Sequence, residues 1–191
     1  EEDYRLNEQL KTLQAEGSSN RGLDNRNFGN LYAGSYDTDK NKIIYNPNVI
    51  AYHGMEGVDT RGVGKDSPEV YGQFGKWVYG LRAMAHTLRS DTYRNKPLEV
   101  ITNTYSRTDR GTDKGSYSSN VASLSGGLLN IGQTVDTHND EELRALMNSM
   151  ITNEVGHNMA PQEVIINEAI RLSKQNMPNS ELYNQMFPLE P

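Results

Sequence analysis

The chain has 191 residues, of which 35% are hydrophobic, and a net charge of -6, so the sequence predicts one domain with an appendage and a modest core. Its 19 basic residues are scattered among 25 acidic ones, which argues against binding duplex DNA because that needs clustered Lys and Arg. The absence of cysteine excludes disulfides and thiolate zinc sites, and no apolar run reaches the roughly 18 residues of a membrane span.

The first predicted element is an amphipathic helix over residues 3–15. Leu6, Leu10 and Leu13 recur at helical spacing among polar residues, and Gly17 ends the segment. A stripe one residue wide is typical of a helix that docks on a larger body, so these leucines are candidate partner-binding residues. The alternative is that the helix packs on its own domain. A third hypothesis is a free-standing adaptor that binds one partner through this stripe.

An extended arm and a hairpin follow the helix. Residues 17–30 are rich in Ser, Asn, Arg and Gly, a composition typical of an irregular linker or arm. Residues 36–45 predict a β-hairpin with its turn at residues 37–41. We therefore expect an N-terminal helix and docking arm over residues 1–40, a helical domain over 41–175 and a C-terminal tail over 176–191. No signal peptide is visible. Because the chain begins at Glu1 rather than Met, we expect it to be processed, trimmed or partly ordered.

Helices dominate the predicted body. Apolar periodicity predicts them over residues 77–89, 97–105, 116–124 and 140–154, and a last one that begins at Pro161. Asn139 is the candidate cap of the fourth helix, with three acidic residues after it. The predicted fold class is therefore mainly α: a small helical domain with an N-terminal helix, an extended arm and one short β-hairpin.

Several short motifs occur in a fixed order along the body. They are Asn46-Pro47-Asn48-Val49-Ile50, Phe74, Gly80-Leu81-Arg82-Ala83-Met84, the pair of helices with Leu98, Ile101, Tyr105, Tyr117 and Val121, and the Glu154-Val155-Gly156 helix end. From Asn46 to Leu172 this order resembles that of small structural proteins of tailed-phage virions. The chain departs from it at residues 106–113, where no proline occurs, and near His53, where a Trp is expected. The resemblance implies a subunit located in the virion.

Glu154 is the candidate catalytic residue. It ends an apolar helix close to His157, and burial there would raise the pKa of a carboxyl and suit it to general-acid catalysis. Lysozyme-like and lytic-transglycosylase domains use a helix-end Glu, so a lysozyme-like fold that cleaves peptidoglycan is the alternative. A structural interpretation instead pairs Glu154 with Arg82, whose guanidinium suits a bidentate contact to a carboxylate or a contact to substrate.

Other patterns do not predict a cofactor. Glu154 and His157 form only half of a di-iron motif, which needs further Glu and His residues. The segment Asp37–Asn41 lacks the Gly and Glu of a calcium loop and predicts a plain turn. We therefore expect no metal and no cofactor. The predicted function is a virion component of the tail, neck or ejected internal set, assembled with other virion proteins in an oligomer, with peptidoglycan as the alternative partner and no direct contact with nucleic acid.

Overall fold

The computed structural model describes residues 1–17, 20–106 and 114–190. It is 47% helical and 15% strand, with a curled four-stranded antiparallel sheet and a second, two-stranded sheet. The expectation of a mainly α fold is therefore wrong, because strands account for much of the first half of the chain.

The chain forms two compact units rather than a helical domain with an arm. Unit 1 consists of Glu1, Asp3–Met84 and Gln175–Pro191, and unit 2 consists of Glu2 and Ala85–Lys174. The boundary predicted at residue 40 does not coincide with them, because the supposed arm contributes a strand to the sheet of unit 1. The predicted tail likewise belongs to unit 1.

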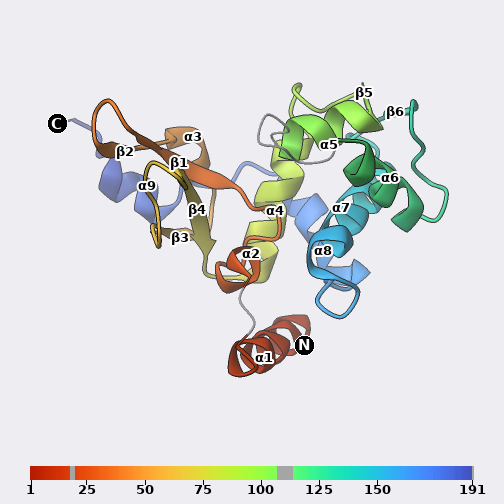
Figure 1. Cartoon of the computed structure of the whole chain (residues 1–191), viewed down its shortest axis with the longest axis horizontal. Helices are drawn as coiled ribbons and strands as arrows, with labels where there is room; N and C mark the ends of the chain where they lie inside the picture. Colours follow the sequence, from red (N-terminus) through yellow and green to blue (C-terminus); the bar gives the residue numbers. More distant parts are fainter. Residues whose placement is uncertain (18–19, 107–113, 191) are drawn as a thin grey trace. The chain divides into compact units, whose positions relative to one another are not determined.

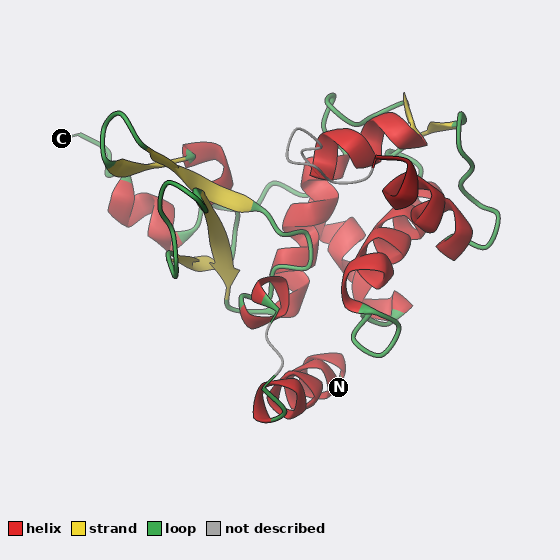
Figure 2. Cartoon of the chain, in the orientation of Figure 1, coloured by secondary structure: helices red, strands yellow, loops and turns green. Residues whose placement is uncertain are grey.

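The sheet of unit 1 has the strand order β2-β1-β4-β3 and is antiparallel throughout (Figure 2). Its strands are β1 (Tyr32–Asp37), β2 (Lys42–Tyr45), β3 (Met55–Asp59) and β4 (Glu69–Phe74). The predicted hairpin is confirmed, since β1 pairs with β2 and Tyr36 lies opposite Ile43. In its turn, Asp37 Oδ1 accepts hydrogen bonds from the backbone N–H groups of Asp39 and Lys40.

Two glycines fit the sheet of unit 1 because a side chain would collide there. A Cβ on Gly72 in β4 would lie 2.4 Å from Cε of Met55, and one on Gly34 in β1 would lie 2.7 Å from the carbonyl oxygen of Ile44. Glycine weakens the alternating pattern by which strands are predicted. The glycines at these closely packed positions therefore weaken the sequence pattern from which the strands would be predicted.

The helices of unit 1 are labelled in Figure 1. They are α1 (Glu2–Ala15), α2 (Arg21–Asp24), α3 (Pro47–Ile50), α9 (Glu181–Met186) and the greater part of α4 (Trp77–Leu88). The side chain of Asn46 caps α3 by accepting a hydrogen bond from the backbone N–H of Asn48, and Pro47 takes the first helical position. α9 packs against both α3 and β3.

Unit 2 is a stack of helices with a small two-stranded sheet. Its elements are α5 (Leu98–Ser106), α6 (Lys114–Leu124), α7 (Asp140–Val155), α8 (Glu163–Ser173), β5 (Lys96–Pro97) and β6 (Thr134–Val135). Each consecutive pair of helices, from α5 to α8, is in contact. Asn139 caps α7 as predicted, its side chain accepting from the backbone N–H of Glu142 at 3.1 Å. Among the described residues, no helix combines the length and apolar character needed to cross a membrane.

Candidate functional site

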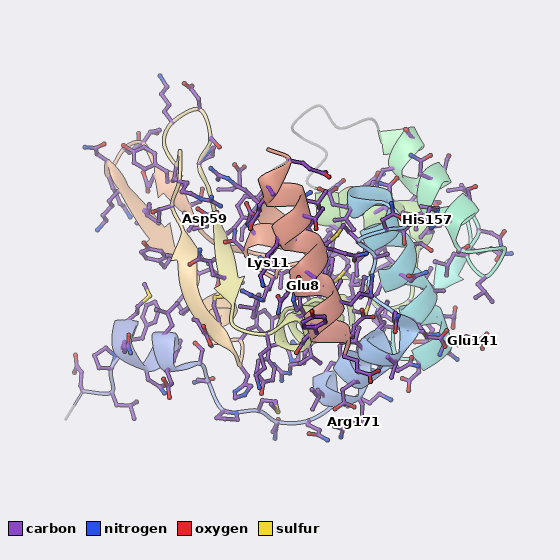
Figure 3. The ribbon with its side chains drawn as sticks, turned by 90° about the horizontal axis from the view of Figure 1, so that it is seen from below. Glu8, Lys11, Asp59, Glu141, His157 and Arg171 are labelled. Carbon is purple, nitrogen blue, oxygen red and sulfur yellow. The ribbon has the colours of Figure 1, made fainter. Side chains whose placement is uncertain are left out.

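Glu154 lies in the last turn of α7 and is exposed. Its neighbour is Tyr117 on α6, whose phenol pKa is raised by burial and further by the negative charge of Glu154. His157, in the turn after α7, is also exposed (Figure 3). The general-acid prediction required a desolvated carboxylate, and the exposure of Glu154 does not provide that environment.

Arg82 is a buried residue of unit 1, whereas Glu154 belongs to unit 2. Its side chain is 5% exposed, and Nη2 donates a hydrogen bond to the carbonyl oxygen of Gln175 at 3.3 Å. Burial lowers the pKa of the guanidinium. Arg82 therefore fastens the C-terminal segment of unit 1 to α4.

The leucine stripe of α1 is largely covered within the chain. Leu6 is fully buried and Leu10 is 8% exposed, while Leu13 is half-buried. Between them, Asn7 Oδ1 accepts hydrogen bonds from Nε1 of Trp77 at 2.9 Å and from Nη2 of Arg26 at 3.3 Å. Leu6 and Leu10 therefore pack within the chain, which agrees with the alternative interpretation of this helix, while Leu13 keeps part of its surface exposed.

Sequence reasoning missed a buried carboxylate at the end of β3 that pairs with an exposed arginine. The side chain of Asp59 is 1% exposed, and Arg61 donates to it from Nε at 2.9 Å and from Nη2 at 2.8 Å (Figure 3 labels Asp59). Asn25 Nδ2 donates to the same carboxylate at 2.9 Å. These hydrogen bonds, above all those from Arg61, hold the pKa of Asp59 well below its usual range.

The hydrogen bonds around Asp59 join distant segments of unit 1. Asn25, just after α2, accepts a hydrogen bond on Oδ1 from Nε2 of Gln73 in β4, and Arg61 also lies 3.7 Å from Asp24. The only signal for this network in the sequence is an Asp-x-Arg spacing in a Gly-rich stretch that predicts a loop. Because both carboxylate oxygens of Asp59 already accept two hydrogen bonds, the network is suited to holding the fold rather than to catalysis.

Unit 2 presents a fixed loop with two exposed aliphatic side chains. In residues 125–133, called here the aliphatic loop, Leu128 is 54% exposed and Ile131 is 50% exposed, whereas Leu129 is buried. Ser125 Oγ accepts a hydrogen bond from the N–H of Leu129 at 3.0 Å, and Glu99 Oε2 accepts one from the N–H of Gly132 at 2.9 Å. The loop is thus anchored at its centre and near its end while two apolar groups face outward.

A cavity of about 400 Å³ opens beside the aliphatic loop. It is lined by Leu124, Ser125, Leu128, Arg144, Ala145, Asn148, Ser149, Glu163 and Ile166. Ser149 Oγ is buried there and has no hydrogen-bond partner within the described residues. Arg144 and Glu163 lie 3.5 Å apart at Nε and Oε1. The lining mixes apolar side chains with polar and charged ones, a combination found where a protein interface passes from its core to its rim.

The described residues therefore offer binding surfaces more clearly than a reaction centre. Within residues 1–17, 20–106 and 114–190, no group of three or more His, Cys, Asp and Glu side chains is arranged to hold a metal ion. Neither the protein-family models nor the curated proteins compared with this chain give a match.

Proposed function

We propose that this chain is a structural subunit of a bacteriophage virion that acts by binding neighbouring subunits. The observation that carries the proposal is the aliphatic loop, where Leu128 and Ile131 remain half exposed although the loop itself is fixed by hydrogen bonds. The order of motifs that resembles small virion proteins supports the same conclusion. In this proposal the neighbouring subunits that the chain binds are other virion proteins.

The aliphatic loop and its cavity have the composition of an interface. A single exposed leucine is ordinary, but here two large aliphatic groups lie in one short loop, and Leu128 also lines a cavity. Arg144, Asn148 and Glu163 add polar groups of the kind that form an interface rim. Each aliphatic side chain gains about 1.5–3 kcal/mol on full burial, so covering the exposed halves of both contributes about 2 kcal/mol to binding.

The test replaces Leu128 and Ile131 together by serine in the phage that encodes the chain. The wild-type chain should be a component of purified particles, and the double variant should be depleted from them, since about 2 kcal/mol is roughly a 30-fold loss of affinity. Val100→Ser is the matched control, because Val100 is 42% exposed in α5 but lies outside the loop. Absence of the wild-type chain from particles, or normal incorporation of the double variant, would contradict the proposal.

A second candidate function is cleavage of peptidoglycan with Glu154 as general acid. The observation that keeps it is access: the carboxylate of Glu154 is exposed in the last turn of α7 and can meet a polymeric substrate, although its exposure leaves it solvated. Purified cell wall incubated with the chain should then release soluble glycan fragments, and Glu154→Gln should abolish the release. Release that persists in this variant, or none with the wild-type chain, would eliminate the enzyme.

A further inference from the structure

Unit 1 contains a polar hollow along α9, which we call the α9 groove. It has a volume of about 700 Å³, within the range of about 300–1,000 Å³ typical of small-ligand pockets. Met55 and Leu182 supply apolar surface. The polar side chains that line it are His53, Glu56, Asn179, Glu181, Asn184 and Gln185.

Buried hydrogen bonds fix the wall of the α9 groove. Ser180, 2% exposed, donates from Oγ to the carbonyl oxygen of Ile50 at 2.5 Å and from its backbone N–H to Ala51 at 3.1 Å. The same Oγ accepts from the N–H of Tyr183 at 3.0 Å and so caps α9. The groove is therefore organised before any ligand arrives, which lowers the entropic cost of binding.

His53 presents a hydrogen-bond acceptor to the α9 groove. Its Nδ1 lies 3.1 Å from the carbonyl oxygen of Pro178, and a carbonyl can only accept, so the proton is on Nδ1. In the neutral ring, Nε2 is then left as an acceptor. The edge contact of the ring with Tyr79, at 4.9 Å between centroids, holds its orientation.

The amide side chains of the α9 groove have no hydrogen-bond partner among the described residues. Asn179, Asn184 and Gln185 each offer an N–H₂ donor and a carbonyl acceptor. A hydroxyl group can accept a hydrogen bond from the N–H₂ group of an amide and can donate one to its carbonyl oxygen. The carboxylates of Glu56 and Glu181 add acceptors, while their charge disfavours an anionic ligand.

An aromatic surface continues the groove along α9. A second hollow of about 470 Å³ shares Asn179 and Asn184 with the first and is also lined by Tyr183 and Phe187. The two rings lie 5.2 Å apart between centroids. Such rings pack against the apolar C–H face of a sugar, whereas the hydroxyl groups at its edge need polar partners.

We propose that the α9 groove binds a neutral saccharide. The hydroxyl groups of the saccharide would bond to the amides, to the two carboxylates and to Nε2 of His53, and a sugar face would lie on Tyr183 and Phe187. A metal ion is not favoured, because no group of acidic and His side chains in the described part is arranged to hold one. The site is independent of the aliphatic loop and of virion assembly.

The test measures binding of soluble saccharides to the full chain by titration calorimetry and NMR. Tetra-N-acetylchitotetraose and cellotetraose serve as neutral probes, a tetralysine peptide serves as the cationic probe, and sedimentation with purified peptidoglycan tests whether a cell wall is the source of the glycan. Asn184→Ala combined with Gln185→Ala should weaken binding of the preferred saccharide by about tenfold or more, since two hydrogen bonds are lost. Asn120→Ala, an exposed amide on α6 in unit 2, should bind like the wild-type chain.

Ser180→Ala provides a second, independent variant. It leaves every lining amide in place but removes two of the hydrogen bonds that organise α9, so it should weaken saccharide binding while circular dichroism shows a folded chain. Saturable binding of either tetrasaccharide that falls in both variants supports the proposal. Absence of such binding, binding unchanged in the amide double variant, or binding of tetralysine alone would overturn it.

Discussion

Replacing Asp59 by asparagine should reveal how much stability unit 1 gains from the hydrogen bonds to its buried carboxylate. Four donors converge on the carboxylate: Oδ1 accepts from the backbone N–H and from Nε of Arg61, and Oδ2 accepts from Nη2 of Arg61 and from Nδ2 of Asn25. Asparagine keeps the shape but replaces one oxygen by an N–H₂ group. Each carboxylate oxygen of Asp59 accepts from two donors. In either orientation of the amide, two of the four donors would therefore face its N–H₂ group, which cannot accept a hydrogen bond.

The expected cost of Asp59→Asn is about 2–4 kcal/mol. An unsatisfied buried donor costs about 1–3 kcal/mol, and Asn25 is only 2% exposed. Loss of the charge adds less, because the side chain of Arg61 is 62% exposed and water can replace its partner. Since 1 kcal/mol shifts Tm by about 4–8 °C in a domain of about 60–100 residues, the Tm of unit 1 should fall by about 10 °C or more.

The stability difference between the wild-type chain and Asp59→Asn should depend on pH in a defined direction. The pKa of Asp59 is lowered in the folded state, so its stabilisation is present above its unfolded pKa of about 3.9 and is lost as pH falls toward the folded value. Urea unfolding should therefore show a large gap between the wild-type chain and Asp59→Asn at pH 7 and a smaller gap near pH 2. Asp66→Asn, an exposed control, should change stability by less than about 0.5 kcal/mol. A pH-independent gap, or none at pH 7, would refute the reasoning.

Three further substitutions test the packing. Gly80→Ala should destabilise unit 1 by about 1–3 kcal/mol, against the helix propensity of Ala, because its Cβ would lie 2.0 Å from the backbone oxygen of Arg26; urea unfolding measures this. Leu6→Ala should cost about 2–5 kcal/mol by the same measurement, since Leu6 is fully buried. Glu154→Gln should lower the pKa of Tyr117 but leave it above the usual value, because burial is the larger cause; NMR titration of labelled tyrosine measures this.

Matched controls accompany these three substitutions. Gly64→Ala should be nearly neutral, because a Cβ there meets no atom within 4 Å. Tyr4→Ala, on the same helix as Leu6, should cost little, since Tyr4 is 72% exposed. Glu141→Gln, at the opposite end of α7 from Glu154, should leave the titration of Tyr117 unchanged (Figure 3 labels Glu141). If a control changed the stability, or the titration of Tyr117, as much as its test variant does, the proposed contact would not be the cause of the change.

Helices could be predicted from the sequence where burial covers one continuous face. The helix predicted over residues 77–89 is observed as α4, and the apolar residues at helical spacing in it are buried: Trp77, Leu81, Met84, Ala85 and Leu88. The predicted end of α7 at Glu154 lies within one residue of its observed end at Val155. Apolar periodicity and capping are local signals, and local signals suffice for such elements.

Strands β3 and β4 and the Asp59 network could not be predicted because they depend on distant partners. A Cβ on Gly72 would lie 2.4 Å from Cε of Met55 on the neighbouring strand, a contact that the local sequence pattern does not reveal. Asp59 meets Asn25 across 34 positions of sequence. The motif at Gly80 and Arg82 could be found from sequence, but its structural basis, close backbone approach and a buried guanidinium, could not.

Unit 1 is built from two stretches of chain separated by all of Ala85–Lys174, and this affects how the protein is made. On the ribosome, the whole of Ala85–Lys174 is synthesised before α9, so unit 1 can be completed only after the sequence of unit 2 has been made. The contact between Ser180 and Ile50 spans 130 positions, so it closes late and slows folding. Until then the nascent sheet lacks its last helix, and a chain released early, before α9, would carry a finished unit 2 and no α9 groove.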